Sequence, residues 1–231
     1  EFDMKLRDDF IYFTGVCHET DTCFTFMNVL RQQESVEGFP GEALPSTAFY
    51  FTKQGVTDWA SLLSYGDMQE TGVRTSDVRN RNRELSHYLM ENAGQELVAC
   101  LFQREDTLQD AAAVLSLSVA DVTEAERMLR TLVNTASADE GRKTPRITFG
   151  YTVNKAYLVY RLPQTTLFKQ LTGFVEPTLD MYAAFYGGRL LLAPDENSLS
   201  HYIRQLDKGE VLNGACLLYT SPSPRDVEES R

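Results

Sequence analysis

The sequence predicts an α+β domain, mainly an antiparallel sheet with helices packed on one face. Apolar and polar residues alternate with a period of two over 115–119 and 147–153, which is typical of half-buried strands. Gly187-Gly188 separates two apolar runs, and paired glycines accept the positive φ of a tight hairpin. The helical segments fall between such strand pairs and not in a regular strand–helix alternation, which favours an antiparallel sheet over a doubly wound one.

Strands are expected at eight places along the chain. They are residues 10–16, 47–53, 96–102, 115–119, 147–153, 157–162, 181–186 and 189–193. Asn154-Lys155 is expected to join the fifth strand to the sixth in a hairpin. In the fifth strand we expect the face with the large apolar residues to be the more buried one: Ile147, Phe149, Tyr151 and Val153.

Two helices are expected in the first hundred residues. The first is expected to begin at Thr20 or Asp21, with four residues facing the core: Cys23, Phe26, Met27 and Leu30. A longer, polar helix is expected from Ser76 to about Ala93. Gly94 would end it, because glycine is the common residue just after a helix.

Three later helices have clear start signals. Asp121 and Glu124 form a capping-box pattern ahead of an apolar stripe at Val122, Ala125, Leu129, Leu132 and Val133. Thr165 begins a short helix that ends at Gly173. Asp195 caps the last helix, whose stripe is Leu199, Tyr202, Ile203 and Leu206.

A strand, an acidic cap and an amphipathic helix recur as a unit at 10–33, 111–135 and 189–207. One interpretation of the recurrence is that this order of elements is simply common in proteins. In the other, residues 1–40 are the end of an upstream repeat and residues 44–213 form the main α+β domain, so the fold is built from repeated strand–helix units.

Residues 216–231 resemble a translated sequencing adapter. One set of codons for CLLYTSPSPRD reproduces the transposase adapter used to prepare sequencing libraries, and VEESR fits the bases that follow it. A Pro-Ser linker is the alternative. We expect a non-native tail here, a natural chain interrupted near Ala215, and an interrupted start, because the first residue is Glu1.

The composition excludes two classes of partner. The net charge is −11 in 231 residues, which argues against binding to nucleic acid or to an anionic lipid surface. No run of about 18 apolar residues is present, so we expect no membrane insertion by this sequence.

The cysteines and histidines form one compact cluster, at Cys17, His18 and Cys23. Three alternatives remain open: a metal site, which lacks a fourth ligand nearby, a disulfide, or two unpaired cysteines. Cys100 lies in an apolar strand and is expected in the core. His87 and His201 lie on polar helix faces outside any catalytic motif. We therefore assign no catalytic, cofactor-binding or metal-binding residue, and expect no cofactor and no enzyme activity.

Two further groups have a polar or binding interpretation. A basic cluster comprises Arg74, Arg79, Arg81 and Arg83, and a solvated helix paired with nearby acids is favoured there over a nucleic-acid contact. Six aromatic residues lie on neighbouring predicted strands: Tyr151, Tyr157, Tyr160, Tyr182, Phe185 and Tyr186. They either pack beneath a second layer, which is favoured, or face a partner protein or glycan.

Several segments together resemble a known family. They are RDDFIYFTGV, EALPSTAFYFTKQGVTDWASLL, GQELVACLF, PRITFGYTVNKAYLVYRLP and LDMYAAFYGGRLLLAPDENSLSHYIRQLDKGEVL, and they span most of 4–213. The chain is similar in these to the bacterial domain-of-unknown-function family thirty-three fifty-two. That resemblance implies an uncharacterised extracytoplasmic protein, attached to the cell envelope through an N-terminal segment that this sequence lacks.

The resemblance carries no catalytic signature. We therefore expect a structural or interaction-mediating envelope module, with an envelope protein or a glycan as partner. The alternative is an envelope hydrolase whose active site lies partly outside this sequence. A cleft lined by two close carboxylates with raised pKa values would favour the hydrolase, and a flat aromatic sheet face with no cleft would favour the binding module.

Overall fold

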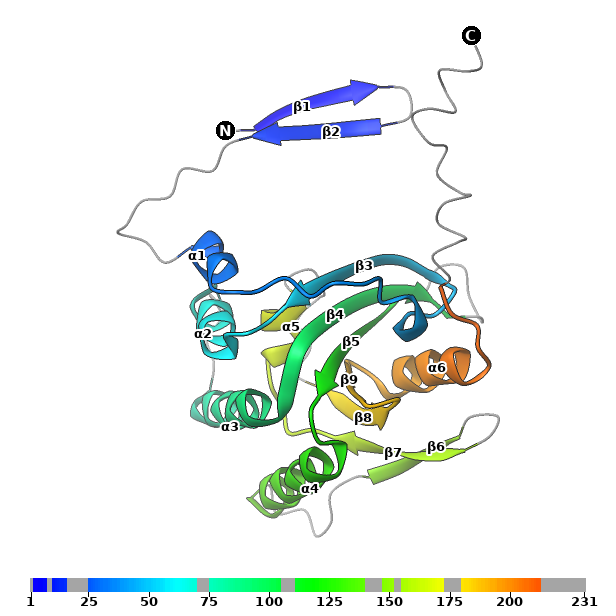
Figure 1. Ribbon diagram of the computed structural model, residues 1–231. Helices are drawn as coiled ribbons and strands as arrows, with labels where there is room; N and C mark the ends of the chain where they lie inside the picture. The colour runs from blue at the N-terminus through cyan, green and yellow to red at the C-terminus, as the bar shows by residue number, and fades with distance from the viewer. Residues whose placement is uncertain are drawn as a thin grey trace.

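A seven-stranded antiparallel sheet organises the chain, in the order β3-β4-β5-β9-β8-β7-β6 (Figure 1). The computed structural model describes residues 2–7, 10–15, 25–69, 75–104, 111–139, 147–151, 155–172 and 180–212. The strands are β3 (Ala48–Gly55), β4 (Ala93–Gln103), β5 (Ala111–Val119), β6 (Ile147–Tyr151), β7 (Ala156–Arg161), β8 (Tyr182–Tyr186) and β9 (Arg189–Ala193). Two more strands, β1 (Phe2–Arg7) and β2 (Phe10–Gly15), pair antiparallel in a separate ribbon. The predicted antiparallel α+β architecture is confirmed.

The helices divide between both faces of the sheet, and not on the single face that was expected. They are α1 (Phe26–Arg31), α2 (Trp59–Gln69), α3 (Ser76–Asn92), α4 (Val122–Asp139), α5 (Leu167–Thr172) and α6 (Glu196–Asp207). One core lies between the sheet and α6, around Phe102, Leu191 and Tyr202. The other lies under α2 to α5 and includes Leu89 and Leu115. Because both faces are covered, β5 is buried on both sides from Ala112 to Leu117.

The sheet has two halves, and in each half three successive strands run from the outside toward the centre: β3, β4, β5 in one and β7, β8, β9 in the other. In one half, β3 leads through α2 and α3 to β4, which pairs with its own neighbour β5. In the other, β7 leads through α5 to β8, which pairs with β9. The halves join where β5 pairs with β9, from Leu115 opposite Leu192 to Ser118 opposite Arg189. The helices that follow the two central strands differ in position: α4, after β5, covers one face of the sheet, and α6, after β9, covers the other.

The beginning of α1 differs from the prediction. The helix begins after Thr25, and Asn28 completes a capping box with it. Val29 is the residue that α1 buries, whereas three of the residues expected to face inward are about 40% exposed: Phe26 at 41%, Met27 at 39% and Leu30 at 37%. Cys23, the fourth, lies outside the described residues. Phe26 nevertheless meets α2, since its ring centroid lies 5.5 Å from that of Tyr65.

In β6, Tyr151 is 70% exposed, which contradicts its assignment to the buried face. Gly150 is the buried residue there, because the ring of Tyr157 lies across it where a Cβ would stand. Within the described sheet, β6 is an edge strand, and the side of Gly150 faces α6. The other members of the expected face are outside the described side chains.

The predicted caps of the later helices are confirmed. The Asp121 carboxylate accepts from the Glu124 amide at 3.0 Å, and the Asp195 carboxylate accepts from the Ser198 amide at 2.8 Å. None of the helices in the described part of the chain has the length and apolar character needed to cross a membrane.

Candidate functional site

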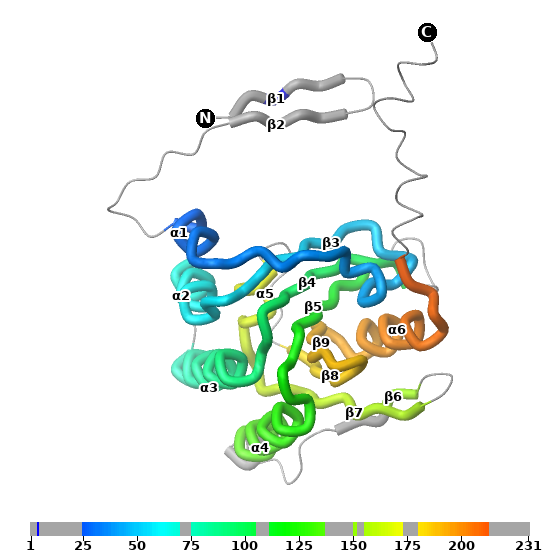
Figure 2. The backbone as a smooth tube through the Cα atoms, in the orientation of Figure 1, coloured from blue at the N-terminus to red at the C-terminus, as the bar shows by residue number. Residues whose placement is uncertain are grey.

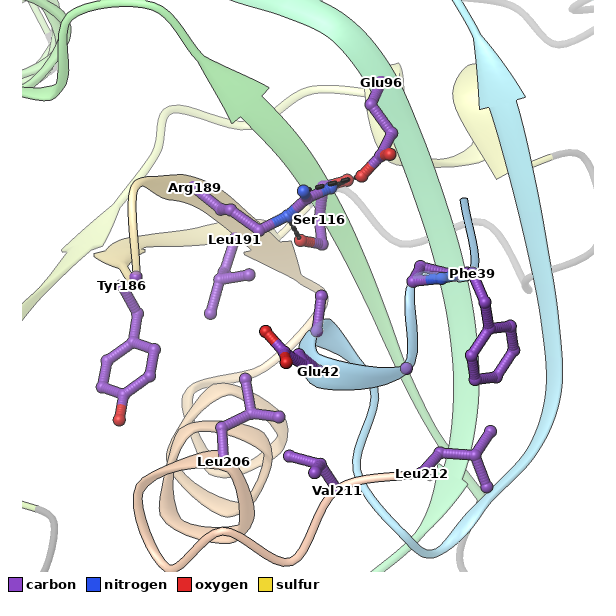
Figure 3. A pocket seen from close by; sticks show the side chains of 14 residues that line it. Phe39, Glu42, Glu96, Ser116, Tyr186, Arg189, Leu191, Leu206, Val211 and Leu212 are labelled. Carbon is purple, nitrogen blue, oxygen red and sulfur yellow. Dashed lines mark hydrogen bonds and ion pairs between the residues drawn. The ribbon is translucent and has the colours of Figure 1, made fainter. Parts of the chain in front are cut away.

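A cleft of about 740 Å³ opens on the α6 face of the sheet (Figure 3). Five parts of the chain line it: residues 39–43, strand β4, strand β5, residues 186–191 of the β8–β9 hairpin, and residues 206–212. Its walls mix charged, aromatic and aliphatic side chains. A volume of this size is in the range of small-ligand sites.

Backbone hydrogen bonds hold the loop that forms one wall, η1 (Gly41–Ala43). The Leu212 amide donates to the Leu44 carbonyl at 2.9 Å, and the Ser46 amide donates to the Glu210 carbonyl at 2.8 Å. Tyr202 of α6 donates its hydroxyl to the Ala43 carbonyl. At Gly41 a side chain would collide with the Leu212 carbonyl, so glycine lets the two segments approach. The wall is thereby fixed to the end of α6.

The floor of the cleft is a polar network centred on Arg189 of β9. One guanidinium nitrogen lies 2.7 Å from Glu96 Oε1, while the others donate to the Ser116 hydroxyl at 2.5 Å and to its carbonyl at 3.2 Å. The side chains of Arg189 and Glu96 are only 19% and 17% exposed. Ser116 itself is buried, although it was expected on the polar face of its strand. A buried hydroxyl needs a partner, and Arg189 supplies it.

Lys53 of β3 holds the second oxygen of Glu96, at 3.5 Å. Its ammonium also donates to three consecutive carbonyls of the segment that follows α1, those of Val36, Glu37 and Gly38, at 2.9, 2.7 and 2.7 Å. Figure 2 shows this segment running beside β3. Both carboxylate oxygens of Glu96 are therefore engaged by cations, and the same lysine ties the chain leading to η1 to the sheet.

The rim carries an open carboxylate and two aromatic rings. Glu42 is exposed, and its carboxylate points into the cleft (Figure 3). Phe39 is 46% exposed and packs edge-on against Phe51, with ring centroids 5.8 Å apart. Tyr186 lies at the other end of the cleft and donates its hydroxyl to Asp207 at 2.9 Å. Burial and this hydrogen bond raise the pKa of Tyr186 to about 12.

The cysteines and histidines singled out in the sequence do not meet in this cleft. Cys17, His18 and Cys23 lie outside the described residues. Cys100 is buried between the sheet and α6, as expected, and burial raises the pKa of its thiol to about 12. His87 is exposed on α3, 3.3 Å from Glu91. His201 is half-buried on α6. Among the described residues, no three potential metal ligands gather.

The predicted strand aromatics divide between the two faces of the sheet. Tyr157, Tyr182 and Tyr186 contact the core under α6, whereas Tyr160 and Phe185 contact the core on the opposite side. Packing beneath a second layer, the favoured interpretation, is confirmed for Tyr157 and Tyr160, which are buried, whereas Tyr182, Phe185 and Tyr186 are only partly covered and Tyr186 lines the cleft. Tyr151, described above, remains exposed, so no flat aromatic sheet face forms from this group.

Two arginines of the basic cluster line a second, smaller cleft of about 360 Å³ between α2, α3 and α5. Arg79 and Arg83 are four residues apart and share one face of α3, which places them near Asp67. Arg81 does not line this cleft, and Arg74 lies outside the described residues. The two arginines are exposed and lie near an acid, in agreement with the solvated helix that was expected.

Comparison with protein-family models, with curated proteins and with solved structures finds no match to this chain. The family resemblance therefore stays a prediction. Sequence reasoning had singled out none of the charged residues of the main cleft. Their one signal is that Arg189 and Ser116 are polar positions within strands that are otherwise apolar.

Proposed function

We propose that this chain is a non-enzymatic module of the cell envelope that acts by binding a partner in the cleft between η1 and β9. The observation that supports binding is a preformed cleft whose floor is a fixed polar network and whose rim carries exposed Phe39 and Glu42. Such mixed walls are typical of ligand sites. The extracytoplasmic location rests on the family resemblance alone.

The alternative is an envelope hydrolase, and one observation bears on it. Two carboxylates, Glu42 and Glu96, line the same cleft. A glycosidase-like pair needs one carboxyl that gives its proton to the leaving group. Glu96 is poorly suited to this, because Arg189 and Lys53 each hold one of its oxygens. A hydrolase would therefore need Glu42, on the exposed rim, as the proton donor and Glu96 as the ionised carboxylate.

The test is a titration of the ¹⁵N-labelled chain, followed by nuclear magnetic resonance. The ligands are blocked tripeptides with a basic, acidic or apolar central residue, and neutral tetrasaccharides. We expect amide shifts in residues 39–43 and 186–191, and no cleavage products after prolonged incubation. Val211→Trp, at the half-buried cleft wall, should abolish the shifts by filling the space.

Met90→Trp is the matched control, since Met90 is 45% exposed on the opposite side of the sheet. It should leave the titration unchanged. Shifts that survive Val211→Trp, or no shifts with any ligand, would contradict the proposal. Cleavage of a ligand that depends on Glu96 would establish the hydrolase instead.

A further inference from the structure

The charges around the main cleft cancel. Two carboxylates, on Glu42 and Glu96, and the Arg189 guanidinium line it, Lys53 lies behind Glu96, and at the rim Asp207 and Lys155 both contact Tyr186. A ligand of either net charge gains little Coulomb attraction from such a balanced set, and a charged group must still give up its hydration to enter. The electrostatics thus favour a neutral ligand with many polar groups.

The cleft presents both hydrogen-bond donors and hydrogen-bond acceptors at defined positions. Glu96 and the Ser116 hydroxyl and carbonyl fix the guanidinium plane of Arg189, so this donor is preorganised. The Glu42 carboxylate, an acceptor only, faces the same space from the opposite wall (Figure 3). A ligand hydroxyl can donate to the Glu42 carboxylate or accept from the Arg189 guanidinium, and a ring with several hydroxyls can do both at once.

Aromatic rings stand at both ends of this polar centre. Phe39 and Phe51 pack with their ring planes at 70°, and Tyr186 is fixed by its bond to Asp207, with the Lys155 ammonium 5.0 Å from the centroid of its ring. The negative face of an aromatic ring attracts weakly positive groups, including the C–H bonds on the flat side of a sugar ring. Between them, aliphatic side chains such as Leu206 complete the wall.

We propose that the cleft binds a neutral oligosaccharide, with Glu42 accepting sugar hydroxyls and Phe39 stacking on a sugar ring. This inference rests on the proposed binding function and narrows its partner to a glycan. A basic peptide is the competing ligand, since it would also pair with Glu42.

The experiment measures binding of four neutral tetrasaccharides by calorimetry: α-linked glucose, β-linked glucose, mannose and N-acetylglucosamine. At least one is expected to bind, with an affinity that stays constant between 50 and 500 mM salt because no ion pair forms. Phe39→Ala and Glu42→Gln are each expected to weaken it at least fivefold. Both residues are exposed, so the fold should tolerate these changes.

Two matched controls lie on α3, on the opposite side of the sheet. Met90→Ala and Glu84→Gln remove an exposed apolar group and an exposed charge there, and should leave the affinity unchanged. If no tetrasaccharide binds but a lysine tripeptide does, with a salt-sensitive affinity lost in Glu42→Gln, the glycan inference is wrong and the binding function stands. If neither class of ligand binds, both proposals are wrong.

Discussion

On the α6 face of the sheet, each partly buried charged side chain is stabilised by the groups that it pairs with. Arg189 satisfies the buried Ser116 hydroxyl and one oxygen of Glu96 at the same time. Removing one member of such a network leaves the others desolvated without a partner, which costs more than the net contribution of the bond itself. The network therefore stabilises the junction between β4, β5 and β9 as well as forming the cleft floor.

Arg189→Ala is accordingly expected to lower the free energy of unfolding by about 1–3 kcal/mol, because Ser116 and Glu96 lose a donor in a mostly buried setting. A urea titration measures it. Arg127→Ala on α4 is the control, since the pair of Arg127 with Glu124 is on the surface and screened by water. Its substitution should give no measurable change, and equal losses in both variants would show that the Arg189 network adds nothing.

The burial of Cys100 makes the stability of the fold depend on pH. Its thiol has a pKa raised to about 12 by burial, whereas in the unfolded chain it ionises near its ordinary value of 9.0. The folded state therefore binds the proton more tightly, and this contribution to stability is complete below pH 9 and is lost as the pH rises toward 12. Burial also raises the pKa of Tyr88 and Tyr202, which adds to the same fall.

Comparison with Cys100→Ala isolates the contribution of the thiol. Urea titrations at intervals between pH 8 and 11 should show a shallower loss of stability in the variant than in the unmodified chain. Identical slopes would mean that Cys100 already ionises at its ordinary pKa in the folded protein.

At the residue scale, alternation placed Ser116 on the face of its strand opposite to Leu115 and Leu117, but did not indicate that Ser116 meets Arg189. Their contact depends on β5 pairing with β9, which brings together positions 73 apart in the chain. Neither strand contains information about that register on its own. Glu42 had no signal at all, because it stands in a loop whose position comes from hydrogen bonds to residues beyond α6.

At the scale of elements, α6 is held to the sheet by a narrow apolar stripe. Leu199, Tyr202 and Ile203 are fully buried, whereas Leu206, the fourth expected member, is only partly buried beside the cleft. Ile203→Ala is expected to lower the free energy of unfolding by about 2–5 kcal/mol through the cavity it leaves. Lys208→Ala, at the exposed end of the helix, should have little effect in the same thermal or urea unfolding measurement.

Asn82 links α3 to the start of α5. Its side chain donates to the Thr166 hydroxyl at 2.7 Å and accepts from the Thr165 hydroxyl at 2.7 Å and the Thr166 amide at 3.1 Å. All three groups are buried. Asn82→Ala is expected to cost about 2–4 kcal/mol of unfolding free energy, because the Thr165 hydroxyl and the Thr166 amide each lose a buried acceptor. Asn80→Ala, exposed on the same helix, should be neutral or slightly stabilising because alanine is the better helix former, and a loss of similar size there would show that the buried hydrogen bonds of Asn82 are not the cause.

Elements with a strong local signal were predicted well, and those that depend on neighbours were not. α3 matches the expected helix within a residue, and its cap at Thr75 is satisfied by Val78. α2 was not predicted, since its apolar face is completed by tertiary packing. Trp59 at its start donates to the Gly94 carbonyl at 2.9 Å, a contact with β4 that no local pattern contains.

At the scale of the whole molecule, the half of the sheet with β3 to β5 and the half with β7 to β9 contribute to the same hydrophobic cores. The core under α2 to α5 takes residues from β4 and β5 in one half and from β7, β8 and β9 in the other. Recurring units were visible in the sequence, but their mirrored order was not, because it results from the long-range pairing of β5 with β9. Neither half buries its own apolar surface alone, since β5 is covered on both faces only in the assembled sheet.

This arrangement predicts one cooperative unfolding transition for residues 44–212, in place of one for each half. Native-state hydrogen exchange should place the amides of β4, β5, β8 and β9 at one common free energy, equal to that of global unfolding. Leu115→Ala in β5 and Leu192→Ala in β9 remove paired, buried side chains, and each should lower the exchange free energy in both halves equally. If Leu192→Ala released only β7 to β9 while β3 to β5 kept their protection, the halves would be separate folding units, and the β5–β9 junction would be an interface between them and not part of one core.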